Sequence, residues 1–138
     1  MTTIAWDGET LAADSQLTGD FIYTAPDKKI FRINNCLLAT AGDDAQCNQF
    51  VEWFRDQKQD YPEKMDDVTV LVISSAGAFE YGACKTPTKI SAPHAVGSGS
   101  CFAMGAMLAG ASAKKAVEIS CKLCKYTSPP VRTARLGK

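Results

Sequence analysis

Two hairpin signatures near the start of the chain constrain its fold more than any other sequence feature. Each consists of two short runs rich in β-forming and apolar residues, separated by a dipeptide that tolerates the positive φ angles of a tight turn. The first signature is 3–6 and 10–13 around Asp7-Gly8, and the second is 29–33 and 36–40 around Asn34-Asn35. We therefore expect the chain to open with two antiparallel β-hairpins.

Helix-like and strand-like segments follow in a definite order. After residue 43, four apolar residues recur at i, i+3, i+4 and i+7, the spacing of one face of an α-helix. They are Cys47, Phe50, Val51 and Phe54. We expect helices over 44–58, 101–110 and 112–123, and strands over 66–74 and 78–83. Strands, one helix, more strands and two helices predict an α+β fold with helices on the outer faces of the sheets.

The length of 138 residues suits one compact domain, which we expect to span residues 1–127. The remaining residues, 128–138, contain Pro129-Pro130 and three cations without an acidic residue. Such a composition is typical of a solvated segment, so it predicts a basic, flexible or docking tail.

Charge and hydropathy exclude several classes of partner. Fifteen basic residues balance fifteen acidic ones, so no overall field would attract nucleic acid or an anionic membrane. The longest nearly apolar stretch, 101–111, is too short to cross a bilayer, and the first residues lack the basic and apolar runs of a secretory signal. We therefore expect a cytoplasmic protein that contacts neither membrane nor nucleic acid.

Six cysteines are scattered along the chain, and only Cys121 and Cys124 form a Cys-x-x-Cys. In a chain without a signal peptide they are better interpreted as small buried hydrophobes than as a disulfide framework. The Cys-x-x-Cys could also bind metal or carry redox chemistry. A zinc site would need two further ligands, and the only histidine, His94, has no partner nearby in sequence.

Five segments, in order along the chain, resemble proteasome β-type peptidases and their bacterial HslV relatives. They are 1–4, 11–15, 27–33, 41–42 and 95–99, and the resemblance continues to about Thr127. It implies a four-layer αββα sandwich, the N-terminal-nucleophile (Ntn) hydrolase fold, whose first strand presents the nucleophile.

The resemblance implies that Thr2 is the nucleophile once Met1 has been removed. The freed α-amino group then lies on the same residue as the hydroxyl and can act as its base, which suits a chain with one histidine. Lys29 would lower the pKa values of both groups, and Asp14 would pair with Lys29. Lys28 competes with Lys29 for this role, since strand alternation directs only one of them inward.

Further roles are implied for Gly42, whose backbone N–H would stabilise an oxyanion, and for Ser98, which would hydrogen-bond near the Thr2 amine. Each has a simpler alternative: Gly42 could end a strand, and Ser98 could cap the helix that follows. Similarly, Thr2 could belong to an ordinary edge strand, and Asp14 and Lys29 could be surface charges.

No cofactor is expected, although the resemblance allows a monovalent cation held by backbone carbonyls around Cys121, Cys124 and Thr127. Gly97-x-Gly99 lacks the third glycine of a dinucleotide loop, and no Gly-Lys-Ser or Gly-Lys-Thr is present, so the chain should not hydrolyse ATP itself. The expected partners are copies of the chain in a homo-oligomeric ring, a separate ATP-dependent unfoldase, and a peptide or unfolded protein as substrate.

Two departures from the family pattern bear on catalysis more than on fold. Gln46 and Lys122 each occupy a position where relatives usually carry an acid. The sequence therefore indicates a threonine endopeptidase, with two alternatives. One is a catalytically inactive structural or assembly protein of the same fold, and the other is an amidase acting on a small molecule.

Overall fold

The computed structural model describes residues 2–24, 29–56 and 60–137. Over these residues the chain forms two main antiparallel sheets, a projecting hairpin and three helices. The first sheet has the order β10 (His94–Gly97), β1 (Thr3–Trp6), β2 (Thr10–Ala13) and β11 (Arg132–Arg135). The second has the order β5 (Ile30–Ile33), β6 (Cys36–Gly42), β7 (Val68–Ser74), β8 (Gly77–Tyr81) and β9 (Thr88–Ile90).

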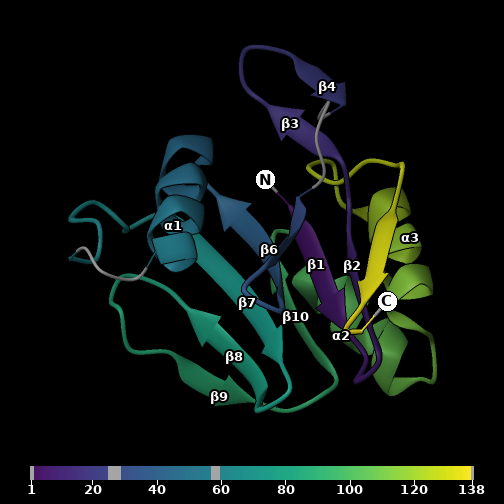
Figure 1. Cartoon of the computed structure of the whole chain (residues 1–138). Coiled ribbons are helices and arrows are strands. Elements are labelled where there is room, and N and C mark those ends of the chain that lie inside the picture. Colours follow the sequence, from purple (N-terminus) through teal and green to yellow (C-terminus); the bar gives the residue numbers. More distant parts are fainter. Residues whose placement is uncertain (1, 25–28, 57–59, 138) are drawn as a thin grey trace.

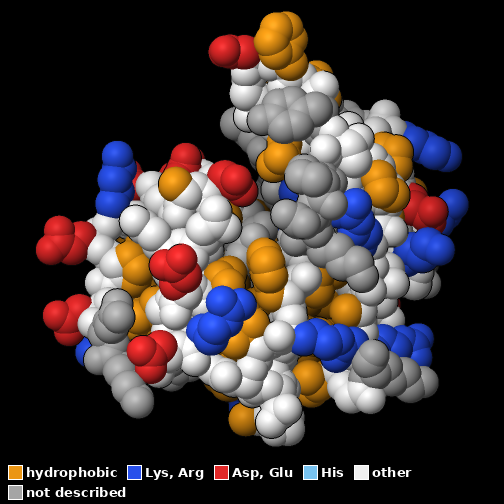
Figure 2. Space-filling view, turned by 45° about the horizontal axis from the view of Figure 1, so that its top comes forward, with side chains coloured by type: hydrophobic (Ala, Val, Ile, Leu, Met, Phe, Trp, Pro, Cys, Tyr) orange, Lys and Arg blue, Asp and Glu red, His pale blue; other side chains and the backbone are white. Residues whose placement is uncertain are grey.

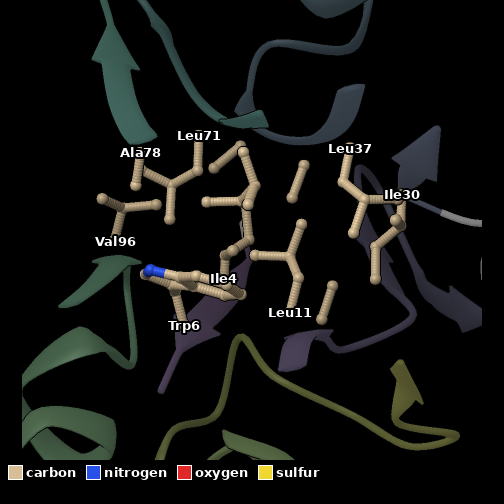
Figure 3. Packing of buried hydrophobic residues seen from close by; sticks show 12 residues of the cluster. Ile4, Trp6, Leu11, Ile30, Leu37, Leu71, Ala78 and Val96 are labelled. Atoms are coloured by element: carbon tan, nitrogen blue, oxygen red, sulfur yellow. The ribbon is translucent and has the colours of Figure 1, made fainter. Parts of the chain in front are cut away.

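The elements stack as four layers (Figure 1). Helix α1 (Asp44–Asp56) covers the outer face of the second sheet, while α2 (Ser100–Leu108) and α3 (Ala113–Leu123) cover the first. The two sheets face each other across a layer of buried apolar side chains, drawn in Figure 3. This arrangement confirms the predicted αββα fold. Among the described helices, none is long and apolar enough to cross a membrane.

Strand alternation explains how the first sheet serves two cores. Ile4 and Trp6 of β1 point toward the second sheet (Figure 3), whereas Ala5 between them packs against the helices. Because successive side chains of a strand point to opposite faces, both faces must be apolar when both are covered. The small Ala5 and Ala12 let α2 and α3 lie close to the sheet.

Both predicted hairpins are confirmed. β1 pairs with β2 in the register Ala5↔Ala12, and β5 pairs with β6 in the register Ile33↔Cys36. The second turn consists of Asn34 and Asn35 with φ angles of 52° and 63°, as a two-residue hairpin turn of this kind requires.

The three helices lie where the apolar spacing predicts them. α1 is described to Asp56, and the rest of the predicted range, to residue 58, lies outside the described residues. α3 begins after Ser112, whose hydroxyl accepts a hydrogen bond from the Lys115 N–H. This N-cap satisfies a backbone donor that the helix itself leaves unpaired.

The prediction of a flexible tail over 128–138 is wrong for the described part of that segment. Residues Arg132–Arg135 form β11, which pairs with β2 in the register Arg132↔Ala13. The basic side chains do not indicate a strand, because charge predicts only that a segment is exposed to solvent. The free edge of β2 has backbone donors and acceptors that an adjoining strand satisfies, whatever side chains that strand carries.

A two-stranded hairpin, β3 (Gln16–Thr18) and β4 (Ile22–Thr24), projects from the body of the molecule near the start of β1 (Figures 1 and 2). Phe21 in its turn and Ile22 at the start of β4 are 78% and 66% exposed. The hairpin was not predicted, since its strands are only 3 residues long.

Candidate active site at the start of strand β1

Thr2 immediately precedes β1 and is buried at the end of the space between the sheets. The alternation that directs Ile4 and Trp6 toward the second sheet places the Thr2 side chain on the same face. Lys29 stands directly before β5 of that second sheet, and its Nζ donates a hydrogen bond to Thr2 Oγ1 at 2.9 Å. The structure thus brings together two residues that are 27 positions apart in sequence.

Asp14 forms an ion pair with Lys29, with Oδ1 and Nζ 3.0 Å apart. The carboxylate is fully buried and also accepts three backbone N–H groups. These are the N–H groups of Thr3 on Oδ1 at 3.1 Å, and of Gln16 and Ser128 on Oδ2 at 3.1 and 3.2 Å. Four donors on one carboxylate fix its position, so Asp14 is not a mobile surface charge.

Lys29 donates a third hydrogen bond, to the backbone carbonyl of Gln16 at 2.7 Å. The side chain is only 9% exposed, and burial lowers the pKa of Lys29, although the nearby Asp14 carboxylate acts in the opposite direction. Because the ammonium group donates to Thr2 Oγ1, the threonine proton must point elsewhere. A cation so placed stabilises negative charge that develops on Oγ1. Lys28 lies outside the described residues.

Ser98 holds the carbonyl group of Thr2. Its backbone N–H and its hydroxyl both donate to Thr2 O, at 2.8 and 3.3 Å. Gly97 makes this approach possible, since it has φ of +99° and any Cβ there would lie 1.9 Å from Thr2 O. Ser98 thus contacts the carbonyl group of Thr2. The expected hydrogen bond near the Thr2 amine stays a prediction, because Met1, which is bonded to that nitrogen, lies outside the described residues.

Gly42 is the exposed last residue of β6, on the strand that pairs with β5. The Thr40 N–H of β6 donates to Lys29 O at 3.2 Å, so this strand end adjoins the lysine. Gly42 has φ of +117°, and a Cβ would lie 2.2 Å from Asp67 O. The position therefore requires glycine for backbone reasons, and its role toward an oxyanion stays a prediction.

Gln46, one of the two departures from the family pattern, has a structural role. Its Nε2 donates to Asp66 Oδ1 at 2.9 Å, and its Oε1 accepts the Asp67 N–H at 2.8 Å. The Asp67 carbonyl in turn accepts the Asp43 N–H at 2.8 Å. Gln46 thus fixes the segment that packs against Gly42. The other departure, Lys122, is exposed on α3.

Two residues that sequence reasoning missed complete the surroundings of Asp14. Gln16 contributes its N–H to Asp14 and its carbonyl to Lys29, and the Ser128 hydroxyl hydrogen-bonds the Gln16 side-chain oxygen. These positions carry little sequence signal, because most of their contacts use backbone atoms. Nearby, the hydroxyls of Thr3 and Thr127 lie 2.7 Å apart.

The three residues suggested for a cation lie together at the end of α3. Thr127 N–H donates to the Cys124 carbonyl at 3.2 Å, and Cys124 Sγ lies 3.7 Å from Ser98 Oγ. A backbone cation site there stays a prediction. Zinc is not favoured: among the described residues no group of three or more His, Cys, Asp or Glu side chains could hold a metal, and His94 pairs with Glu80 at 2.7 Å.

The two thiols of this segment differ in their surroundings. Burial raises the pKa of Cys121 to about 11. Burial also acts to raise the pKa of Cys124, but hydrogen bonds with the Thr127 side chain, the Tyr126 backbone and the Ser98 side chain outweigh it and lower that pKa.

A sequence model described as "Proteasome subunit" matches residues 3–79, more than half of the chain. The chain belongs to the proteasome subunit family. Its matched region contains Asp14, Lys29 and Gly42, and ends within β8.

Solved structures share the fold of this proteasome-family chain. BPH of Thiobacillus denitrificans, solved in complex with epoxomicin, is similar over 99% of each chain, with a TM-score of 0.75 at 20% identity. Eukaryotic HslV of Trypanosoma brucei is similar over 96% of this chain and 97% of its own, with a TM-score of 0.71 at 20% identity. No curated protein sequence matched the chain.

Proposed function

We propose that this chain is a threonine-type endopeptidase whose nucleophile is Thr2, freed by removal of Met1. The observation that carries the proposal is the buried Lys29 ammonium group, 2.9 Å from Thr2 Oγ1 and paired with Asp14 at 3.0 Å. An ordinary edge-strand threonine has no need for a buried ion pair at its hydroxyl, because burying two charges is costly.

In the proposed reaction, the free α-amino group of Thr2 takes the proton of its own hydroxyl as Oγ1 attacks the substrate carbonyl. Lys29 stabilises the developing charge on Oγ1, and Asp14 keeps Lys29 in place. The tetrahedral intermediate collapses to an ester on Thr2 as the α-ammonium group gives its proton to the substrate nitrogen, which leaves as the amine of the departing peptide. Water, activated by the same amino group, then hydrolyses the ester.

The backbone supplies the remaining parts of the proposed site. The Gly42 N–H is the candidate donor for the oxyanion, since glycine leaves the surface at that strand end open to a substrate carbonyl. Ser98 fixes the Thr2 carbonyl and so limits rotation of the residue that carries both base and nucleophile.

We further propose that the substrate is a peptide or an unfolded protein, that the chain works as a homo-oligomeric ring in the cytoplasm, and that a separate ATP-dependent unfoldase supplies it. Family membership supports assembly. The exposed Phe21 and Ile22 on the projecting hairpin also support it, because apolar side chains grouped on a protruding element favour protein contacts. No cofactor is required in this proposal, and a monovalent cation near Thr127 would serve structure only.

The test combines intact mass with inhibitor binding. We expect the purified protein to have lost Met1, and to gain the mass of one epoxomicin molecule, the compound found in complex with the T. denitrificans structure. Thr2→Ala should abolish adduct formation and lower peptide hydrolysis on the order of 10⁴-fold. Thr2→Ser, which keeps a hydroxyl, should retain part of the activity.

The control is Thr133→Ala, which removes an exposed threonine of β11. It should leave both adduct formation and hydrolysis unchanged, and all three variants should unfold at nearly the same denaturant concentration. Retention of Met1 with no adduct would favour the inactive structural protein. Thr2-dependent turnover of small amides without cleavage of peptides would favour the small-molecule amidase.

A further inference from the structure

The thiols of Cys121 and Cys124 lie one helical turn apart at the end of α3. Cys124 is the C-cap of α3, with an extended backbone, and its N–H still donates to the Ser120 carbonyl at 2.8 Å, so the helix continues through Leu123 between the two cysteines. Because the two residues between them are helical, the Cα atoms of Cys121 and Cys124 are separated by about 5 Å. Disulfides join Cα atoms roughly 4.4–6.8 Å apart, so this pair can be joined with little backbone movement.

Both sulfur atoms are free thiols, and they differ in access. Cys121 is partly exposed beside the α2–α3 cluster, where a small oxidant can reach it, whereas Cys124 is buried. A second cysteine beside an oxidised one can resolve its sulfenic acid as a disulfide.

Cys124 is connected to the proposed nucleophile through a single serine. Its Sγ donates to Ser98 Oγ at 3.7 Å, and Ser98 Oγ donates to Thr2 O at 3.3 Å. A sulfur atom bound in a disulfide has no proton to donate. Oxidation of Cys124 therefore removes the donor that orients the Ser98 hydroxyl, and turns the sulfur toward Cys121.

We propose that Cys121 and Cys124 are a reversible dithiol–disulfide pair whose oxidation loosens the hold of Ser98 on Thr2. The effect on turnover rests on the proposed peptidase function, whereas formation of the disulfide does not. The reduced pair corresponds to the hydrogen-bonded arrangement described above, and the oxidised pair is the less active form.

The chemistry balances with hydrogen peroxide as oxidant. One thiol takes an oxygen atom from the peroxide to become a sulfenic acid, and one water molecule is released. The second thiol then displaces the sulfenic hydroxyl as a second water molecule, and the S–S bond forms. A dithiol such as dithiothreitol reverses the reaction by thiol–disulfide exchange and becomes oxidised itself.

Peptide mapping tests the disulfide directly. Lys122 lies between the two cysteines, so trypsin separates them onto peptides 116–122 and 123–125. After treatment of the full chain with hydrogen peroxide, blocking of free thiols and digestion, we expect these two peptides to be joined. Dithiothreitol should separate them. Cys101 is exposed, so its oxidation shows that the peroxide treatment worked. If Cys101 is fully oxidised and the joined peptides are absent, the proposal is overturned.

Activity and amide exchange test the consequence. Loss of one oriented hydrogen bond predicts a fall in kcat/KM of about tenfold on oxidation. Hydrogen exchange of the Ser98 amide should also become faster, and dithiothreitol should restore both. Cys121→Ser, compared with its own untreated sample, should show neither change, whereas Cys101→Ser should respond as the unaltered protein does.

The outcomes separate this inference from the proposed function. A joined peptide pair with unchanged Ser98 exchange would overturn the coupling to Thr2, as would an equal response of Cys121→Ser. If the reduced protein cleaves no peptide, the proposed function fails. The dithiol pair and its coupling are then judged by the joined peptides and the exchange rate alone.

Discussion

At the residue scale, Lys29 is a buried ammonium group that bridges three chain segments. It bonds to Thr2 before β1, to Asp14 after β2 and to Gln16 in β3. The family resemblance predicted Thr2, Asp14 and Lys29 because each has a recognisable side chain. It could not predict Gln16 or Ser128, since these contribute largely backbone atoms that many side chains would leave unchanged.

The depressed pKa of Lys29 predicts a pH-dependent stability. Burial lowers that pKa from its ordinary value of 10.5, which the unfolded chain retains. Between the two pKa values the unfolded state binds more protons, so the free energy of unfolding rises with pH. We expect the stability difference between the unaltered protein and Lys29→Met to shift in favour of the unaltered protein as pH increases toward 10.5.

Urea unfolding at several pH values above neutrality measures this difference, and titrating groups common to both proteins cancel from it. Two curves that stay parallel over the whole range would contradict the prediction, because they would mean that Lys29 titrates alike in the folded and unfolded chains.

At the scale of elements, the segments predicted well were those whose signal is local. The turn residues Asp7-Gly8 and Asn34-Asn35 encode their own backbone geometry, and the spacing of Cys47 to Phe54 marks the buried face of α1. β9, β10 and β11 were missed because each is short and is held by a neighbouring strand. A segment of three or four residues carries no sequence signal that identifies its partner strand.

Gly97, the last residue of β10, and Gly105, within α2, provide a paired test of how close the backbone of another segment lies to a glycine. Gly97→Ala would place a Cβ against the Thr2 carbonyl and also strain a positive φ, so we expect a loss of stability of about 3 kcal/mol or more. Gly105 lies within α2, and a Cβ there would meet nothing within 4 Å. Gly105→Ala should instead stabilise the protein by about 0.5–1 kcal/mol, through helix propensity.

Denaturant unfolding of both variants measures the contrast. Equal effects of the two substitutions would show that the close approach of β10 to Thr2 is absent in solution.

At the scale of the whole molecule, the first and last strands of the described chain lie in one sheet (Figure 1). β11 covers the edge of β2, and the segment before it reaches Asp14 through the Ser128 N–H. Ser15 adds two more links, from its N–H to Ser128 O and from its hydroxyl to Pro130 O. The stability of the first sheet and the order of the site therefore depend on the same late segment.

Removal of residues 131–138 should expose the edge of β2 and lower the free energy of unfolding on the order of 2–4 kcal/mol. Peptide hydrolysis should fall as well, because Ser128 loses the strand that anchors it. Arg135→Gln keeps the strand but removes an exposed charge, and should cost less than about 1 kcal/mol. A truncated protein as stable as the full chain would show that β11 is dispensable.

The four donors on Asp14 also set an order of events during synthesis. Three of them come from Lys29, Gln16 and Thr3, which leave the ribosome early, but the fourth comes from Ser128, 114 residues after Asp14. Until Ser128 has been made, the Asp14 carboxylate lacks one of its four hydrogen-bond donors, and Lys29 is held less firmly at Thr2. The hydrogen-bonded surroundings of Asp14 and Lys29 are therefore complete only when nearly all of the chain has been made.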